Sequence, residues 1–307
     1  AIGRDPKRLV SADEIGITVA LAAPLRGESL ITTVRATRLV LNLVGGAPGE
    51  TFVSEVERGK ALALLTTASR IDIVDARVVL PVPGGVPLAA DALNGGMERT
   101  KQGVRLVLHG RAAGGVIDVA GDLTGDGHRV ALTIGGRGLD AAALPILAGR
   151  VRGLVDLRLD VMDVGDTRHM DGRVAVREGR VVGGGPRALL PVSVASRRVL
   201  AELYPAFAGD DLRFEDARAI FSWRGGTWHF PRIFVATQDV IAGGRARVTA
   251  KGEVVGHGTL RLPAEVVASL QPHEPRIEGF RAGDGAATLP FVVGGPLEAP
   301  HFTLDRP

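Results

Sequence analysis

Short runs in which apolar and polar side chains alternate recur along most of this chain. The clearest run spans residues 154–163, in which Val155, Leu157, Leu159 and Val161 alternate with charged residues and Met162. Successive side chains of a strand point to opposite faces of a sheet, so this period of two predicts a β-strand with one apolar face. The same pattern predicts further strands over residues 104–109, 129–134, 173–177, 217–224, 228–230, 233–235, 246–248 and 260–262.

The stretches between these runs are short and contain glycine, which favours hairpin turns. They include residues 113–115, 124–127, 224–227 and 242–244. Glycine adopts the positive φ values that tight turns need, and consecutive hairpins produce an antiparallel meander. The 42 glycines and 18 prolines lie between valine-rich runs, which is typical of an all-β protein. We predict a mainly β fold, a long, twisted and curled antiparallel sheet that forms a β-groove or half-barrel.

Helical segments are few and short. Ser196 is a predicted N-cap for a helix in which Val199, Leu200, Leu203 and Phe207 recur at helical spacing. Residues 139–147 and 263–270 are shorter candidates. We expect these helices to cap the sheet by covering its open face or one end, and a gating role is the alternative.

The glycine-rich segment 183–186 marks a candidate boundary in the chain. It separates an N-terminal β-sheet region, residues 1–185, from a C-terminal β region, residues 186–307. The two regions together are also interpretable as one continuous domain. A chain of 307 residues is long enough to bury a sizeable core in either arrangement.

Composition and charge narrow the functional classes. With 45% hydrophobic residues the chain is not intrinsically disordered, and the absence of cysteine excludes disulfides and thiolate chemistry. The formal net charge is +3, and no block of like charges stands out. Nucleic-acid binding requires a concentrated basic face with interleaved aromatic residues, so we expect no nucleic-acid partner. A weak attraction to anionic lipid surfaces fits this charge better.

The sequence lacks motifs for catalysis, metal binding or nucleotide binding. Its seven histidines show no pair at the spacing of a metal-binding helix. The best polar cluster is His169 and Asp171 with two further aspartates nearby, and we interpret it as a solvated loop. Asp156 and Asp160 share a strand face, but an arginine lies between them, which disfavours a carboxylate pair for glycoside hydrolysis. We therefore predict a protein that is not an enzyme and needs no metal or other cofactor.

Three stretches carry a resemblance to a known family. The chain ends with an alternating apolar strand, a Gly-Gly-Pro turn and a proline-delimited tail over residues 287–305. Residues 104–160 cycle through short strands and glycine turns and include the segment 138–153, and residues 210–262 form a further ladder. These patterns resemble the C-terminal region of AsmA-like proteins, the bacterial envelope family that includes TamB-type lipid-transport proteins.

The resemblance implies a fold and a function. AsmA-like proteins form a groove whose apolar interior accommodates the acyl chains of lipids, so the expected ligand is a phospholipid or another acyl lipid. A periplasmic, membrane-associated protein of the cell envelope with a role in outer-membrane biogenesis is implied in the same way. The family carries an N-terminal membrane helix, and we expect inner-membrane anchoring through such a segment, which is absent from this sequence.

The predicted groove lining consists of apolar residues on the clearest strands: Val155, Leu157, Leu159, Val161, Phe221, Trp223, Trp228, Phe230, Leu289, Phe291 and Val293. The alternative arrangement is a closed β-sandwich or barrel in which the apolar faces meet. The alternative function is a structural or interaction subunit of an envelope complex, which binds a partner protein through its sheet edges and moves no lipid.

Overall fold

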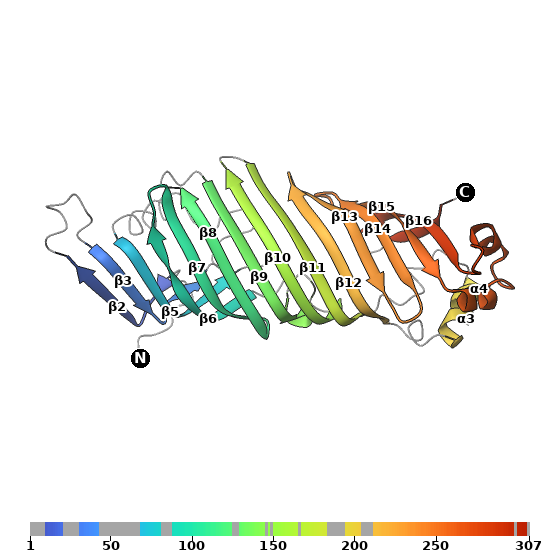
Figure 1. The fold of residues 1–307 in the computed structure, drawn as a ribbon, viewed down its shortest axis with the longest axis horizontal. Helices are drawn as coiled ribbons and strands as arrows, with labels where there is room; N and C mark the ends of the chain where they lie inside the picture. The colour runs from blue at the N-terminus through green and yellow to red at the C-terminus, as the bar shows by residue number, and fades with distance from the viewer. Residues whose placement is uncertain are drawn as a thin grey trace. The chain divides into compact units, whose positions relative to one another are not determined.

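A computed structural model shows that the protein is mainly β, as predicted, with 72% of its described residues in strands (Figure 1). The structure describes residues 10–20, 31–42, 68–80, 88–124, 129–144, 147, 150–164, 167–182, 194–203, 211–297 and 300–305. Few short helices accompany the strands, and the sheet is curled and unclosed. The predicted fold class is therefore confirmed.

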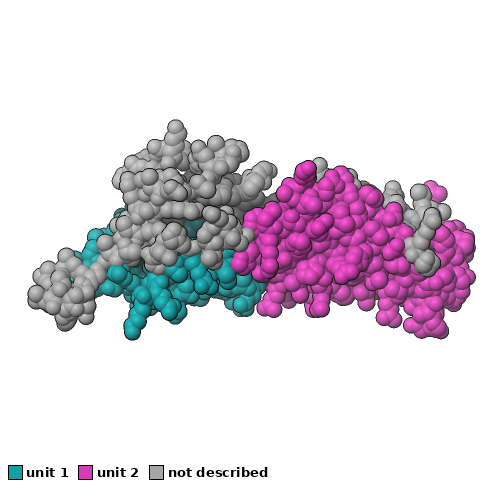
Figure 2. Space-filling model, turned by 90° about the horizontal axis from the view of Figure 1, so that it is seen from above, with its two compact units in different colours: residues 1–139, 143–146, 158–168 teal, residues 140–142, 147–157, 169–307 magenta. Residues whose placement is uncertain are grey.

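The chain divides into two compact units, which are coloured separately in Figure 2. Unit 1 comprises residues 1–139, 143–146 and 158–168, and unit 2 comprises residues 140–142, 147–157 and 169–307. This division passes through strand β10 (Val151–Val164) and the start of β11 (Thr167–Val181). The predicted boundary at residues 185 and 186 lies outside the described residues.

Unit 1 contains a meander of long strands and a smaller N-terminal part. Its strands are β1 (Val10–Ser11), β2 (Glu14–Val19), β3 (Ile31–Thr37), β4 (Val40–Asn42), β5 (Ala68–Leu80), β6 (Leu88–Arg99), β7 (Gly103–Ala112), β8 (Gly115–Thr124) and β9 (Arg129–Asp140). Strands β5 to β9 pair antiparallel in sequence order. Strands β3 and β4 both pair parallel to β5, so the sheet is mixed at this point rather than antiparallel throughout.

Strand β2 pairs antiparallel with β3, and every one of its residues is exposed. Ile15, Ile17 and Val19 alternate along it and are 63%, 58% and 47% exposed. A strand with exposed apolar side chains and one described neighbour offers unpaired backbone groups to another strand. Strand β2 is therefore a candidate edge for strand addition.

The described strands of unit 2 form an antiparallel meander from β11 to β17. Its further strands are β12 (Leu212–Arg224), β13 (Thr227–Ala236), β14 (Ile241–Val248), β15 (Glu253–Leu262), β16 (Ala287–Pro296) and β17 (His301–Leu304). Each pairs with the strand before it. The pairing of β13 with β14 shifts register between Phe230 and Ile233, on either side of Pro231. Proline has no backbone N–H to donate to the neighbouring strand, and the interruption of the ladder accommodates it there.

The helices differ in detail from the prediction. Helix α3 (Val194–Leu203) contains Ser196 as its third residue, fully buried, so the prediction of Ser196 as the N-cap is wrong. Helix α4 (Ala264–Leu270) forms where residues 263–270 predict it, with Pro263 as N-cap. The described part of the segment 139–147 contains a short 3-10 turn, η2 (Ala141–Ala143). A second 3-10 turn, η4 (Pro275–Phe280), follows α4.

Two predicted turns are in fact strand. Gly243 and Gly244 lie inside β14, and the preceding turn is made at residues 237–240 by backbone bonds to the Thr237 hydroxyl. A side chain at Gly244 would meet the carbonyl oxygen of His257 at 2.8 Å, so a close strand approach explains this glycine. The Gly294-Gly295-Pro296 segment likewise completes β16, and the turn follows at Leu297.

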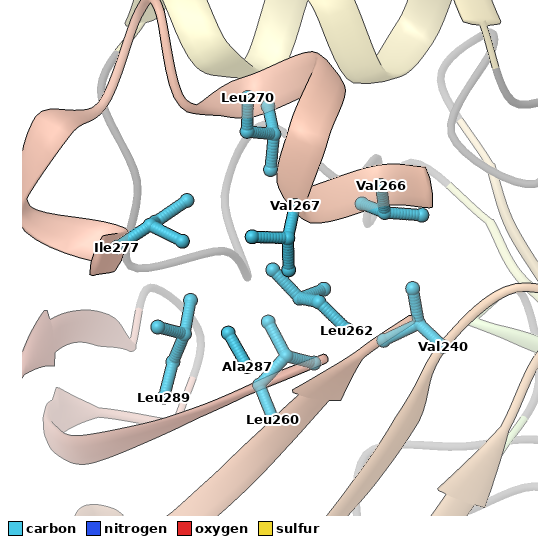
Figure 3. Packing of buried hydrophobic residues seen from close by; sticks show 9 residues of the cluster. All are labelled: Val240, Leu260, Leu262, Val266, Val267, Leu270, Ile277, Ala287 and Leu289. Atoms are coloured by element: carbon cyan, nitrogen blue, oxygen red, sulfur yellow. The ribbon is translucent and has the colours of Figure 1, made fainter. Parts of the chain in front are cut away.

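The core of unit 2 forms where helix α4 packs on the sheet (Figure 3). Apolar side chains of α4 and η4 gather over the ends of β15 and β16, and every member of the resulting cluster is at most 5% exposed. The cluster consists of Val240, Leu260, Leu262, Val266, Val267, Leu270, Ile277, Ala287 and Leu289. Unit 1 has a smaller cluster within its sheet, made of Ile73, Ala76, Ala90, Leu93 and Ala112.

The polar face of unit 1 carries a charged group spanning β7, β8 and β9. The Nδ1 atom of His109 lies 2.6 Å from the carboxylate of Asp118, and Arg137 lies 3.4 Å from the same carboxylate. The hydrogen bond with His109 is the main reason that the pKa of Asp118 lies below its usual value, and the positive charge of Arg137 acts in the same direction. Because a lowered pKa favours the ionised form, this stabilisation is present above the ordinary aspartate pKa and is lost as the pH falls.

We expect Asp118→Asn to lower the free energy of unfolding at neutral pH by less than about 1 kcal/mol, since the group is well exposed. The difference from the wild type should become smaller at an acid pH below the lowered pKa of Asp118, where its carboxyl is protonated and uncharged like the amide of the variant. Urea unfolding at the two pH values measures it. An equal difference at both would contradict the assignment of the effect to the ionised carboxylate.

Candidate ligand-binding face

One face of unit 2 is apolar from β11 to β17. Residues that lie directly opposite each other on paired strands share a face, so the register determines its members. They are Met170, Gly172, Val174, Val176, Ala217, Ala219, Phe221, Trp223, Trp228, Phe230, Ile233, Val235, Ala242, Gly244, Ala246, Val248, Val254, Gly256, Gly258, Leu260, Leu262, Ala287, Leu289, Phe291, Val293, Phe302 and Leu304. None of them carries a charge, and we call this set the apolar face.

Exposure varies systematically across the apolar face. Where α4 packs on it, Leu262 and Leu289 are completely buried. Further toward β11, the aromatic and aliphatic side chains of β12, β13 and β14 are only partly buried. The face thus has a closed part under α4 and an accessible part along β12 to β14.

An aromatic cluster occupies the accessible part. The ring centroid of Phe221 lies 5.8 Å from that of Trp228 and 6.2 Å from that of Phe230. The rings of Trp228 and Phe230 are stacked with centroids 6.5 Å apart. These distances are within the range in which aromatic pairs attract one another, so the rings support each other while one side of them stays accessible.

The opposite face of the same strands carries charged residues, with single exposed apolar residues such as Ile220 and Val255 between them. It carries Arg218 beside Asp216, Arg177 beside Asp156, and Arg224 within 3.9 Å of Asp171. These charged pairs are solvated on the outer face, and they add little to the stability of the fold because they are exposed. The contrast between the two faces leaves the apolar face as the surface on which an apolar ligand gains most by leaving water.

The structure places the predicted lining residues in three groups. Phe221, Trp223, Trp228, Phe230 and Phe291 lie on the apolar face of unit 2 and are partly exposed. Leu289 and Val293 lie on the same face but are 0% and 8% exposed; Leu289 belongs to the closed part under α4, whereas Val293 is buried outside that cluster, opposite Gly256.

The four predicted residues of β10 are divided between the units. Val155 and Leu157 belong to unit 2, where Val155 is only 1% exposed and Leu157 is partly buried. Leu159 and Val161 belong to unit 1 and are also partly buried. Their neighbour Asp160 accepts a hydrogen bond from the Thr133 hydroxyl at 2.6 Å, so Leu159 and Val161 lie on the other, apolar side of β10.

Unit 1 has an apolar face of its own, most of which the predicted strands do not include. Paired positions place Ile71, Met97, Leu106 and Gly121 in one row across β5 to β8. The alternation of Ile71 and Ile73 with charged residues indicates an apolar strand face at this position. Glycines such as Gly121 carry no apolar side chain, so the pattern did not identify them as part of the face.

The polar candidates lie in strands rather than at a site. His169 and Asp171 lie within β11, which corrects the prediction of a loop. Among the described residues, no group of three or more histidine or acidic side chains is placed to hold a metal ion. Asp156 pairs with Arg177 at 2.8 Å and Asp160 bonds Thr133, so each carboxylate has its own partner.

Comparisons of the chain with protein-family models, curated proteins and solved structures found no significant match. Within the described part of the chain, no helix has the length and apolar character needed to cross a bilayer.

Proposed function

We propose that this chain is a non-catalytic lipid-binding or lipid-transfer protein of the bacterial envelope, located in the periplasm. Acyl chains of a phospholipid or a related lipid lie against the accessible part of the apolar face. The observation that carries this proposal is the uncharged face of unit 2, which spans β11 to β17 and is only partly buried along β12 to β14. The sequence resemblance to AsmA-like proteins supports the same function.

The energetics favour a ligand of this kind. An acyl chain that buries about 15 methylene groups gains up to about 12 kcal/mol, at about 0.8 kcal/mol per group, before the costs of ordering the chain. No charged group on the apolar face is desolvated when the chain binds. Binding therefore needs no dedicated head-group motif, and no catalytic residue takes part.

Native mass spectrometry of the protein purified from its own cells tests this proposal. We expect lipid to copurify in stoichiometric amounts and to be released as phospholipid or fatty acid on organic extraction. The control is the same protein stripped of lipid by a detergent and refolded, which should take up lipid again. Protein that never carries lipid and takes none up would contradict the proposal.

A second function has one specific observation in its favour. Strand β2 exposes Ile15, Ile17 and Val19 at an edge of unit 1, as strand addition to a partner protein requires. In that case the chain is a structural subunit of an envelope complex and moves no lipid. Lipid-free protein that copurifies with a stoichiometric partner, and that loses it when Ile17 is replaced by proline, would favour this second function.

A further inference from the structure

Three hairpin tips of unit 2 lie side by side and form one rim. They are residues 224–227 between β12 and β13, residues 249–252 between β14 and β15, and Leu297 after β16. The Leu297 amide donates a hydrogen bond of 2.8 Å to the carbonyl of Gly252. A side chain at Gly226 would come within 3.1 Å of the Ala250 Cβ atom, so the first two tips are also in contact range. We call these three tips the hairpin rim.

The hairpin rim borders the accessible part of the apolar face. Strand β15 runs from the rim at Glu253 to α4 after Leu262. Helix α4 covers the apolar face at the far end of this strand, where Leu262, Val266 and Val267 are at most 1% exposed. A lipid that reaches the accessible part therefore meets a closed core at the α4 end and partly exposed aromatic rings at the rim.

Both tryptophans of the chain lie at this rim. Trp223 and Trp228 are a directly opposed pair, one step before the closing pair of Arg224 and Thr227. Both are partly buried and lie on the apolar face. Tryptophan combines a large apolar ring with an N–H donor, and for this reason it concentrates where hydrocarbon meets polar head groups.

Among the described residues at and beside the three tips, three cations stand against two carboxylates. Lys251 at a tip and Arg224 and Arg247 beside the tips are exposed, against the carboxylates of Glu253 and Asp171. Asp171 lies 3.9 Å from Arg224 in a pair whose side chains are 68% and 51% exposed, so water weakens this pair. Leu297 at the third tip is 50% exposed, so the rim also presents an apolar side chain to its surroundings.

We propose that the hairpin rim of unit 2 docks on the surface of a bilayer that contains anionic lipids, and that lipid enters the apolar face there. This proposal rests on the proposed lipid-binding function and adds to it the membrane as the lipid source and the rim as the entry. Paired tryptophans, an exposed leucine and the exposed cations Lys251, Arg224 and Arg247 fit a membrane interface better than a water-soluble partner. Such a partner is one outcome of the test below.

The tryptophans make the test site-specific, since the chain contains no others. The full chain is mixed with vesicles of phosphatidylcholine, with and without about 30% phosphatidylglycerol to supply the anionic charge. We expect sedimentation with the anionic vesicles, a blue shift of the tryptophan emission, and quenching by lipids brominated near the head-group end of the chain. Because docking is partly electrostatic, binding should weaken as salt is raised.

Two kinds of quenching must be separated. After the vesicles are pelleted in high salt, quenching that stays with the soluble protein reports lipid taken into the apolar face. Quenching that disappears with the vesicles reports docking of the rim. The two readouts therefore measure lipid uptake and membrane docking independently in one experiment.

Variants test which residues dock. Trp223→Ser with Trp228→Ser should reduce vesicle binding by about tenfold or more for each tryptophan that enters the interface. Lys251→Glu should reduce it by at least about fivefold, since one cation near an anionic surface is worth about 1 kcal/mol. The matched control is Lys101→Glu, at an exposed turn of unit 1, which should leave vesicle binding unchanged. Circular dichroism checks that each variant is folded.

The outcomes distinguish the two proposals. Protein that takes up lipid monomers but does not sediment with vesicles overturns the docking proposal and leaves the proposed function standing. Equal losses in the Lys251 and Lys101 variants, or vesicle binding without any change in tryptophan emission, also overturn docking by the rim. Protein that docks through the tryptophans but never retains lipid overturns the proposed function and the entry role of the rim. Stoichiometric capture of a soluble protein through the rim, without vesicle binding, overturns membrane docking.

Discussion

Replacement of Leu262 by alanine is expected to lower the free energy of unfolding of unit 2 by about 2 to 5 kcal/mol. Leu262 is completely buried between the sheet and α4, beside Val266 and Ala287. Removing its terminal carbons leaves a cavity that the surrounding side chains fill only in part. Urea unfolding followed by circular dichroism measures the change.

Leu154→Ala is the matched control for this experiment, because Leu154 undergoes the same change while 51% exposed. Its effect should stay within about 0.5 kcal/mol. Similar losses in the two variants would contradict the closed core under α4. A large loss at Leu262 alone supports it and identifies α4 as the element that closes this part of the apolar face.

Ile233→Asp is expected to reduce lipid retention strongly while leaving the protein folded. Ile233 lies on the accessible part of the apolar face, opposite Ala219 and Gly244, and is partly exposed. The new carboxylate keeps access to water in the free protein, but a bound acyl chain would bury it. We expect a loss of at least about tenfold in copurified lipid, since desolvating an unpaired charge costs several kcal/mol.

The same chemical change on the outer face provides the control. Ile220 in β12 is 46% exposed and opposes Arg232, so Ile220→Asp adds a charge that stays in water whether or not lipid is bound. Lipid content should not change in this variant. Unchanged lipid in a folded Ile233→Asp protein would remove the apolar face of β13 from the binding site.

The strands predicted from alternation formed because each has one apolar face, and β10 and β12 are good examples. The alternation does not predict strands β5 and β6, and local backbone geometry explains why. Asp75 and Ala92 have positive φ values of 54° and 51°, and the register shifts beside both. Asn94 accepts a hydrogen bond from the Asp75 amide and donates one to the Ala92 carbonyl. Such irregularities interrupt the period of two without ending the strand.

The sequence predicts which residues of β16 share the apolar face, but it does not predict which of them are accessible to a ligand. Alternation places Leu289, Phe291 and Val293 on one face of one strand, and the structure agrees. Only the packing of α4 and η4 makes Leu289 buried while Phe291 stays partly exposed. That packing depends on how the preceding segments α4 and η4 fold back over the sheet, and the alternation within β16 carries no information about it.

The meander of unit 2 also bears on how the protein folds. Strands β12 to β16 each pair with the strand before and the strand after, so most of these contacts join residues close in sequence. Short loops cost little entropy to close, and such a sheet can nucleate at one hairpin and grow strand by strand, much as repeat proteins do. The parallel pairing of β3 with β5 joins residues that are distant in sequence, because parallel strands need a long crossover connection between them. That connection has to close before the first hydrogen bond between the two strands can form. Folding of unit 1 is therefore expected to be limited by this single crossover, while unit 2 assembles from neighbour to neighbour.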